Sequence, residues 1–88
     1  MKNIIVDCTH IQTPLQLHQS LSAALAFPQW YGNNLDALYD CLTELGQPLH
    51  LILQSLPQEA PWAAGFLSVF ADATRDNPYF SFAMTNPC

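Results

Sequence analysis

Short β-type runs that alternate with helical segments limit the fold of this chain more than any other feature. Residues rich in β-branched, leucine or aromatic side chains occur at 3–7, 49–53 and 79–84. Helical patterns fall between these runs, at 13–26, at 34–45, and from a start between 57 and 61 to about 75. The order β-α-α-β-α-β is typical of parallel strands joined by right-handed crossovers. We therefore expect an α/β fold, a small three-stranded parallel sheet packed with about three to four helices.

Local signals indicate where several elements begin and end. Thr13 is suited to cap the first helix, with Pro14 at its first position. Asn34 can cap the second helix, and Gly46 is expected to end it. The run 3–7 is continuously apolar at its centre, so we expect a buried strand there.

Length and composition predict one domain that spans residues 1–88. Half of the chain is hydrophobic and 10% is charged, which argues against disorder. No apolar run approaches 18 residues and the N-terminal residues do not form a targeting signal, so we expect a cytoplasmic protein without a membrane anchor. With only Lys2 and Arg75 as cations and a net charge of −5, direct binding to nucleic acid is not expected.

The cysteines and histidines do not form a recognisable metal site. Cys8, Cys41 and Cys88 are an odd number without a secretory signal, which favours reduced thiols. Cys8 and His10 could supply two ligands, but nothing nearby completes a set of four. We expect no metal and no cofactor, with Cys41 as a small buried side chain and His18 at the edge of the core.

The predicted second helix separates leucines from acids. At 100° per residue its leucines share one face, while Asp36, Asp40 and Glu44 form a line at spacing i, i+4, i+8. Like charges at this spacing are unfavourable by about 0.2–0.5 kcal/mol per pair, and the helix carries no basic residue. Residues 8–35 carry no charged side chain at all. A solvated helix face and a binding surface are both compatible with this line of acids.

Large aromatic side chains border the acids. Trp30 and Tyr31 lie in the loop before the helix, and Tyr39 falls between its leucines and its aspartates. Exposed aromatics beside acids are typical of interface anchors, although aromatic residues also pack into cores. For Tyr31 the two roles are equally favoured by the sequence.

The segment 28–42, PQWYGNNLDALYDCL, closely resembles the signature of the barstar family, intracellular inhibitors of a secreted bacterial ribonuclease. An opening strand, a helix with Leu17-His18 and a later helix with Val69-Phe70 occur in matching order. The resemblance covers most of the chain, although the segment after Glu44 differs from barstar. It implies a small parallel sheet flanked by helices and an inhibitor rather than an enzyme.

The resemblance also implies a partner-binding set, carried over position by position. Barstar has tyrosine at the position of Trp30, tryptophan at that of Tyr39 and glutamate at that of Asp72. The implied contact residues are Trp30, Gly32, Asn34, Asp36, Tyr39, Asp40 and Asp72. Carboxylates on a rigid helix can take the place of RNA phosphates and accept paired hydrogen bonds from arginine, and Asp40 is expected at the centre.

The implied partner is a basic, extracellular-type ribonuclease resembling barnase. Because the cysteines are unpaired and the acids repel one another, we expect the inhibitor to be a monomer when it is free. Two alternatives stay open. A barstar-like module could bind a partner that is not a ribonuclease. A small hydrolase could use Asp36 and Asp40 as an acid/base pair, but carboxylates on adjacent turns of one helix do not face each other across a substrate.

Overall fold

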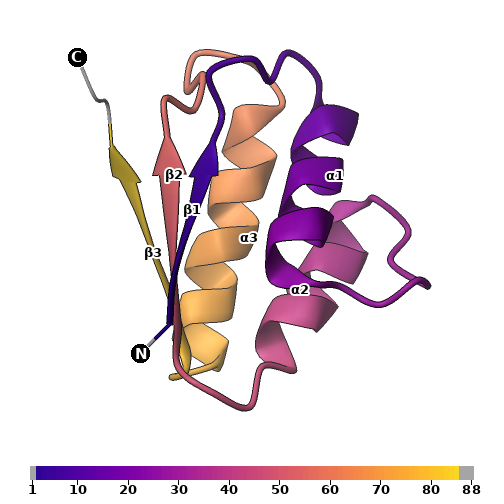
Figure 1. Ribbon diagram of the computed structural model, residues 1–88, viewed down its shortest axis with the longest axis vertical. Helices are drawn as coiled ribbons and strands as arrows, with labels where there is room; N and C mark the ends of the chain where they lie inside the picture. Colours follow the sequence, from indigo (N-terminus) through magenta and orange to yellow (C-terminus); the bar gives the residue numbers. More distant parts are fainter. Residues whose placement is uncertain (1, 86–88) are drawn as a thin grey trace.

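A three-stranded parallel sheet forms one layer of the molecule, and three helices lie together on one of its faces (Figure 1). The computed structural model describes residues 2–85. Its elements are β1 (Lys2–Asp7), α1 (Pro14–Leu25), α2 (Leu35–Thr43), β2 (Leu49–Gln54), α3 (Ala63–Asp76) and β3 (Phe80–Thr85). β2 is the central strand, with Lys2 and Phe80 paired to either side of Leu49. The predicted α/β class, strand direction and element order are confirmed.

The core lies between the sheet and the helices. α1 packs against β1 and α3 against β3, whereas α2 packs mainly against α3. Phe66 and Phe70 of α3 and Phe80 of β3 are almost completely buried, and their rings follow one another at centroid distances of 6.4 and 6.2 Å. Buried residues from every element join one hydrophobic cluster. None of the helices within residues 2–85 has the length and apolar character needed to cross a membrane.

The expectation that the first strand is buried is wrong. In β1 only Val6 is buried, and Ile5 is 57% exposed. The helices cover one face of the sheet (Figure 1), and β1 is an edge strand. Alternate side chains of β1 therefore face solvent. The central strand β2 shows the same alternation, since Leu49, Leu51 and Leu53 are buried and the residues between them are half-buried.

The start of α1 is as the sequence predicts. The hydroxyl of Thr13 accepts a hydrogen bond from the backbone N–H of Gln16, and the Gln16 side chain accepts one from the N–H of Thr13. This reciprocal capping box satisfies two of the N–H groups that the first turn of a helix leaves free. Pro14 occupies the first helical turn, where its missing N–H is not needed.

The end of α2 differs from the prediction. The helix stops at Thr43, before Leu45 and without using Gly46, which does not adopt a left-handed conformation. The cause lies elsewhere in the chain: the side-chain amide of Asn77 donates hydrogen bonds to the carbonyls of Leu42 and Leu45, at 2.9 and 3.1 Å. Asn77 is buried and follows the last residue of α3, and through these two bonds it caps the end of α2.

The start of α3 also differs from the prediction. The helix begins at Ala63, not between residues 57 and 61. Two successive turns precede it, closed by hydrogen bonds from Ala60 N–H to the Pro57 carbonyl and from Ala63 N–H to the Ala60 carbonyl, both 3.0 Å. These bonds span three residues rather than the four of an α-helix, so the chain turns twice before helical geometry begins.

Candidate functional site

The loop between α1 and α2 sends its two neighbouring aromatic side chains in different directions. Trp30 is 59% exposed, whereas Tyr31 is only 7% exposed and belongs to the core. A turn fixes this loop locally, because the N–H of Tyr31 donates to the carbonyl of Pro28 at 3.0 Å. Of the two roles that the sequence left open for Tyr31, the structure therefore shows core packing. Trp30 is presented to solvent.

A buried polar pair holds this loop against α1. The Nδ1 atom of His18 lies 2.5 Å from the hydroxyl of Tyr31, and the His18 ring also packs on Phe66 at a centroid distance of 4.7 Å. Burial lowers the pKa of His18, which favours a neutral imidazole, and burial raises the pKa of Tyr31. Sequence reasoning placed His18 at the edge of the core but missed this hydrogen bond.

Asn34 joins the loop to the first turn of α2. Its side-chain oxygen accepts a hydrogen bond from the N–H of Ala37 at 2.8 Å, which confirms the predicted cap. Its amide nitrogen donates to the carbonyl of Gly32 at 3.4 Å. A Cβ atom on Gly32 would lie 2.9 Å from that nitrogen, so a larger residue there would disturb the cap. Asn33, not Gly32, takes the left-handed conformation of the turn.

Helix α2 separates its two faces as predicted. Leu38 and Leu42 are completely buried and Cys41 is 6% exposed, whereas Asp36 and Asp40 are exposed. Within residues 2–85, no hydrogen bond or ion pair is made by the carboxylate of either aspartate. Asp36 lies in the first turn, where the helix dipole favours a negative charge. Asp40 lies beyond that turn, so the helix dipole does not stabilise its negative charge in the same way.

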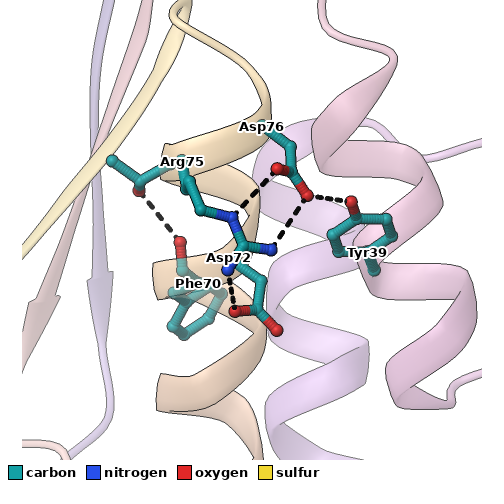
Figure 2. Close-up of polar contacts among 6 residues, drawn as sticks. Tyr39, Phe70, Asp72, Arg75 and Asp76 are labelled. Carbon is teal, nitrogen blue, oxygen red and sulfur yellow. Dashed lines mark hydrogen bonds and ion pairs between the residues drawn. The ribbon is translucent and has the colours of Figure 1, made fainter.

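A second group of charges lies on α3, beside Tyr39 of α2 (Figure 2). The hydroxyl of Tyr39 donates a hydrogen bond to Asp76. Arg75 donates to both oxygens of Asp76, from Nε at 3.1 Å and from a terminal nitrogen at 3.3 Å. Its other terminal nitrogen lies 3.5 Å from Asp72. Tyr39 therefore connects α2 to a network of three charged side chains.

The protonation of this network follows from its contacts. Arg75, and secondarily the Tyr39 hydroxyl, lower the pKa of Asp76. The hydrogen bond to Asp76 raises the pKa of Tyr39, because the carboxylate stabilises the protonated hydroxyl that donates to it. Sequence reasoning did not single out Arg75 or Asp76 for the site. Their positions three and four residues after Asp72 place all three on one helix face, and that spacing could have indicated them.

We use the term acidic face for Asp36 and Asp40 of α2 together with Asp72 and Asp76 of α3. The two pairs lie on helices that pack directly against each other, and Tyr39 of α2 bonds to Asp76 of α3. The loop with Trp30 leads straight into the α2 half of this face. Within the described part of the chain, no three histidine, cysteine or acidic side chains are grouped so that they could hold a metal ion. Cys8 and Cys41 are free and buried, and Cys88 lies outside the described residues.

Comparison with known protein families agrees with this arrangement. The family model described as "Barstar (barnase inhibitor)" matches residues 1–84, which include all six strands and helices except the last residue of β3. This chain belongs to the barstar family. The match also includes the segment after Glu44, whose sequence differs from that of barstar.

A relative from Bacillus subtilis (strain 168) supports the same assignment to the barstar family. It carries the name "Putative ribonuclease inhibitor YrdF" and is 40% identical over 73 residues. The aligned region covers 82% of this chain and 76% of the relative, so the likeness extends well beyond the loop and α2.

Proposed function

We propose that this barstar-family chain is an intracellular inhibitor of a basic ribonuclease, and that its α2 carboxylates occupy the positions of RNA phosphates. The observation that carries the proposal is the state of Asp36 and Asp40, two exposed acids without an internal ion pair in residues 2–85. They stand on a helix whose opposite face is anchored by buried Leu38 and Leu42. The protein supplies binding groups and performs no chemistry.

The chemistry of a ribonuclease site explains why carboxylates suit it. An enzyme that holds a phosphodiester needs cationic side chains, and arginine forms paired, charge-assisted hydrogen bonds with carboxylates as it does with phosphates. Because the backbone of Asp36 and Asp40 is fixed in a packed helix, little backbone entropy is lost when they bind. Asp40 is the central contact in this proposal, and Asp36 and Asp72 lie to its sides.

Trp30 completes the proposed surface as an aromatic anchor. An indole ring that is 59% exposed next to an acidic helix can pack over the ribonuclease site and exclude water from the charge pairs. Exclusion of water strengthens those pairs, because the local dielectric falls. Gly32 and Asn34 hold the loop in place, so their role in the proposal is to position Trp30 as well as to approach the partner.

Two further parts of the proposal concern the free protein. We infer that it is a monomer, because the exposed carboxylates of α2 repel a second copy of the same face, and that its thiols are reduced, because it has an odd number of cysteines. Sedimentation at micromolar concentration tests this, and a stable dimer formed through α2 would contradict it. A barstar-like module with a non-nuclease partner is the alternative, and co-purification from native cells followed by an RNA-cleavage assay of the bound protein separates the two.

The sharpest test compares binding with stability at Asp40. Replacement of Asp40 by alanine should weaken binding to the co-purified ribonuclease by at least about 2 kcal/mol, because partner cations lose their counter-charge. The same change should leave the free energy of unfolding unaltered or raise it by a few tenths of a kcal/mol, because repulsion from Asp36 is relieved. Glu59→Ala is the matched control, since Glu59 is an exposed acid on the segment before α3.

The two measurements are a binding titration and a denaturant unfolding curve for each variant. Asp40→Ala with unchanged affinity would refute the phosphate-mimic role of this residue. A loss of affinity that matches an equal loss of stability would make Asp40 structural. Association should also slow as salt rises, because exposed charges are screened over about 8 Å at physiological ionic strength.

A further inference from the structure

Arg75 is the chain's only arginine, and it lies within the acidic face. The chain has two cationic residues, Lys2 and Arg75, against seven acidic ones. The Arg75 side chain is 70% exposed, yet it reaches both Asp72 and Asp76 on its own helix (Figure 2). A cation at this place changes what the acidic face can bind.

The two halves of the acidic face differ in their free charge. On α3, Arg75 bonds to both oxygens of Asp76, and Tyr39 supplies a third bond, so Asp76 is already well satisfied. Asp72 also has Arg75 at 3.5 Å. On α2, Asp36 and Asp40 have no such neighbour among the described residues. A basic partner therefore meets two uncompensated carboxylates on α2 and two carboxylates shared with a guanidinium on α3.

We propose that Arg75 is a specificity-determining residue that directs the cations of a partner onto Asp36 and Asp40 and disfavours a partner with a cation opposite Asp72. This inference rests on the proposed function and refines its partner: a ribonuclease whose basic cluster lies over α2 and which meets Asp72, at the side of the contact, through a neutral group or through a hydrogen-bond acceptor that faces Arg75, rather than through a cation. Like-charge contacts at an interface are a common means of excluding wrong partners.

The test uses a hexa-arginine peptide as a cationic probe of the full chain, followed by NMR at low ionic strength. In the wild-type protein the peptide should shift the signals of Asp36 and Asp40 and leave those of Asp72 nearly unchanged. In Arg75→Gln it should also shift Asp72 and bind about two- to fivefold more tightly, the range of exposed ion pairs. Because Arg75 is exposed, the substitution should not affect folding, and an unchanged spectrum outside α3 verifies this.

Lys2→Gln is the matched control, because it makes the same change in net charge at the first residue of β1. It should leave the peptide on α2 and tighten binding less than Arg75→Gln does. Equal shifts at Asp40 and Asp72 in the wild type, or equal behaviour of the two variants, would overturn the role of Arg75.

An assay of the same variants for inhibition of barnase distinguishes a failure of this inference from a failure of the proposed function. If the peptide binds as expected but no variant inhibits the enzyme, the role of Arg75 stands and ribonuclease inhibition is contradicted for barnase. If inhibition is strong but is the same in wild type and Arg75→Gln, the proposed function is supported and the specificity role of Arg75 is refuted.

Discussion

His18 and Tyr31 form a buried hydrogen bond, with 2.5 Å between Nδ1 and the phenolic oxygen, that joins helix α1 to the loop carrying Trp30. Both side chains are less than a tenth exposed. Buried polar groups of this kind are stable only in pairs, because a donor or acceptor left without a partner keeps its desolvation cost. The position of the candidate binding loop therefore depends on a contact inside the core.

Tyr31→Phe should destabilise the protein by about 1–3 kcal/mol, because Nδ1 of His18 loses its partner without any change in apolar packing. Denaturant unfolding measures the loss. Tyr39→Phe removes a hydroxyl from a more exposed bond, to Asp76, and should cost less. Equal losses of unfolding free energy in the two variants would show that burial does not increase the contribution of the His18–Tyr31 pair to stability.

Stability should fall as the pH is lowered from 7 towards 5. Burial lowers the folded-state pKa of His18 below its unfolded value of 6.5, so the unfolded chain takes up a proton that the folded protein refuses. The contribution of His18 is therefore complete above pH 6.5 and decreases below it. Unfolding free energies across this range test the trend. An NMR titration in which His18 protonates at or above pH 6.5 would contradict it.

Leu38→Ala should damage folding. The Leu38 side chain is completely buried, and truncations of this kind cost about 2–5 kcal/mol. The melting temperature should fall by many degrees, whereas Leu15→Ala, at a side chain that is 50% exposed, should change it little. A variant of Leu38 that melts like the wild type would mean that this face of α2 is not a core face.

Trp30→Ala should affect binding and not folding. Its exposed indole makes it a candidate anchor, so its removal should weaken ribonuclease binding by about 2 kcal/mol or more. The free energy of unfolding should stay within about 0.5 kcal/mol of wild type. Tyr79→Ala truncates another exposed aromatic residue, 46% exposed before β3, and serves as the control. Equal losses of affinity in the two variants would argue against a specific role for Trp30.

Elements with local causes were predictable from sequence. The strand and helix order follows from hydrophobic periodicity, and the caps Thr13 and Asn34 act within three residues of their partners. Features set by distant residues were not. Asn77 ends α2 from more than thirty positions away, and the exposure of β1 depends on which face of the sheet the helices cover.

In the candidate site, too, features with local causes could be predicted and features set by distant residues could not. The acids of α2 and the exposure of one loop aromatic could be anticipated, because both follow from helix periodicity and from the likeness of residues 28–42 to barstar. The resemblance indicated Trp30 as the contact residue, but the burial of Tyr31 could not be predicted, because it depends on His18 from another helix. The pairing of Tyr39 with Asp76 similarly requires the packing of α2 on α3.

The pairing of β1 also has a consequence for how this protein is made. Lys2 pairs with Leu49 and Asp7 with Gln54, so β1 has no sheet partner until the chain has been synthesised as far as β2. Until then Ile4, Ile5 and Val6 remain an unpaired apolar segment. Such distant pairing slows folding and exposes strand edges during synthesis. Strand β1 thus depends on prompt synthesis of the chain as far as Gln54.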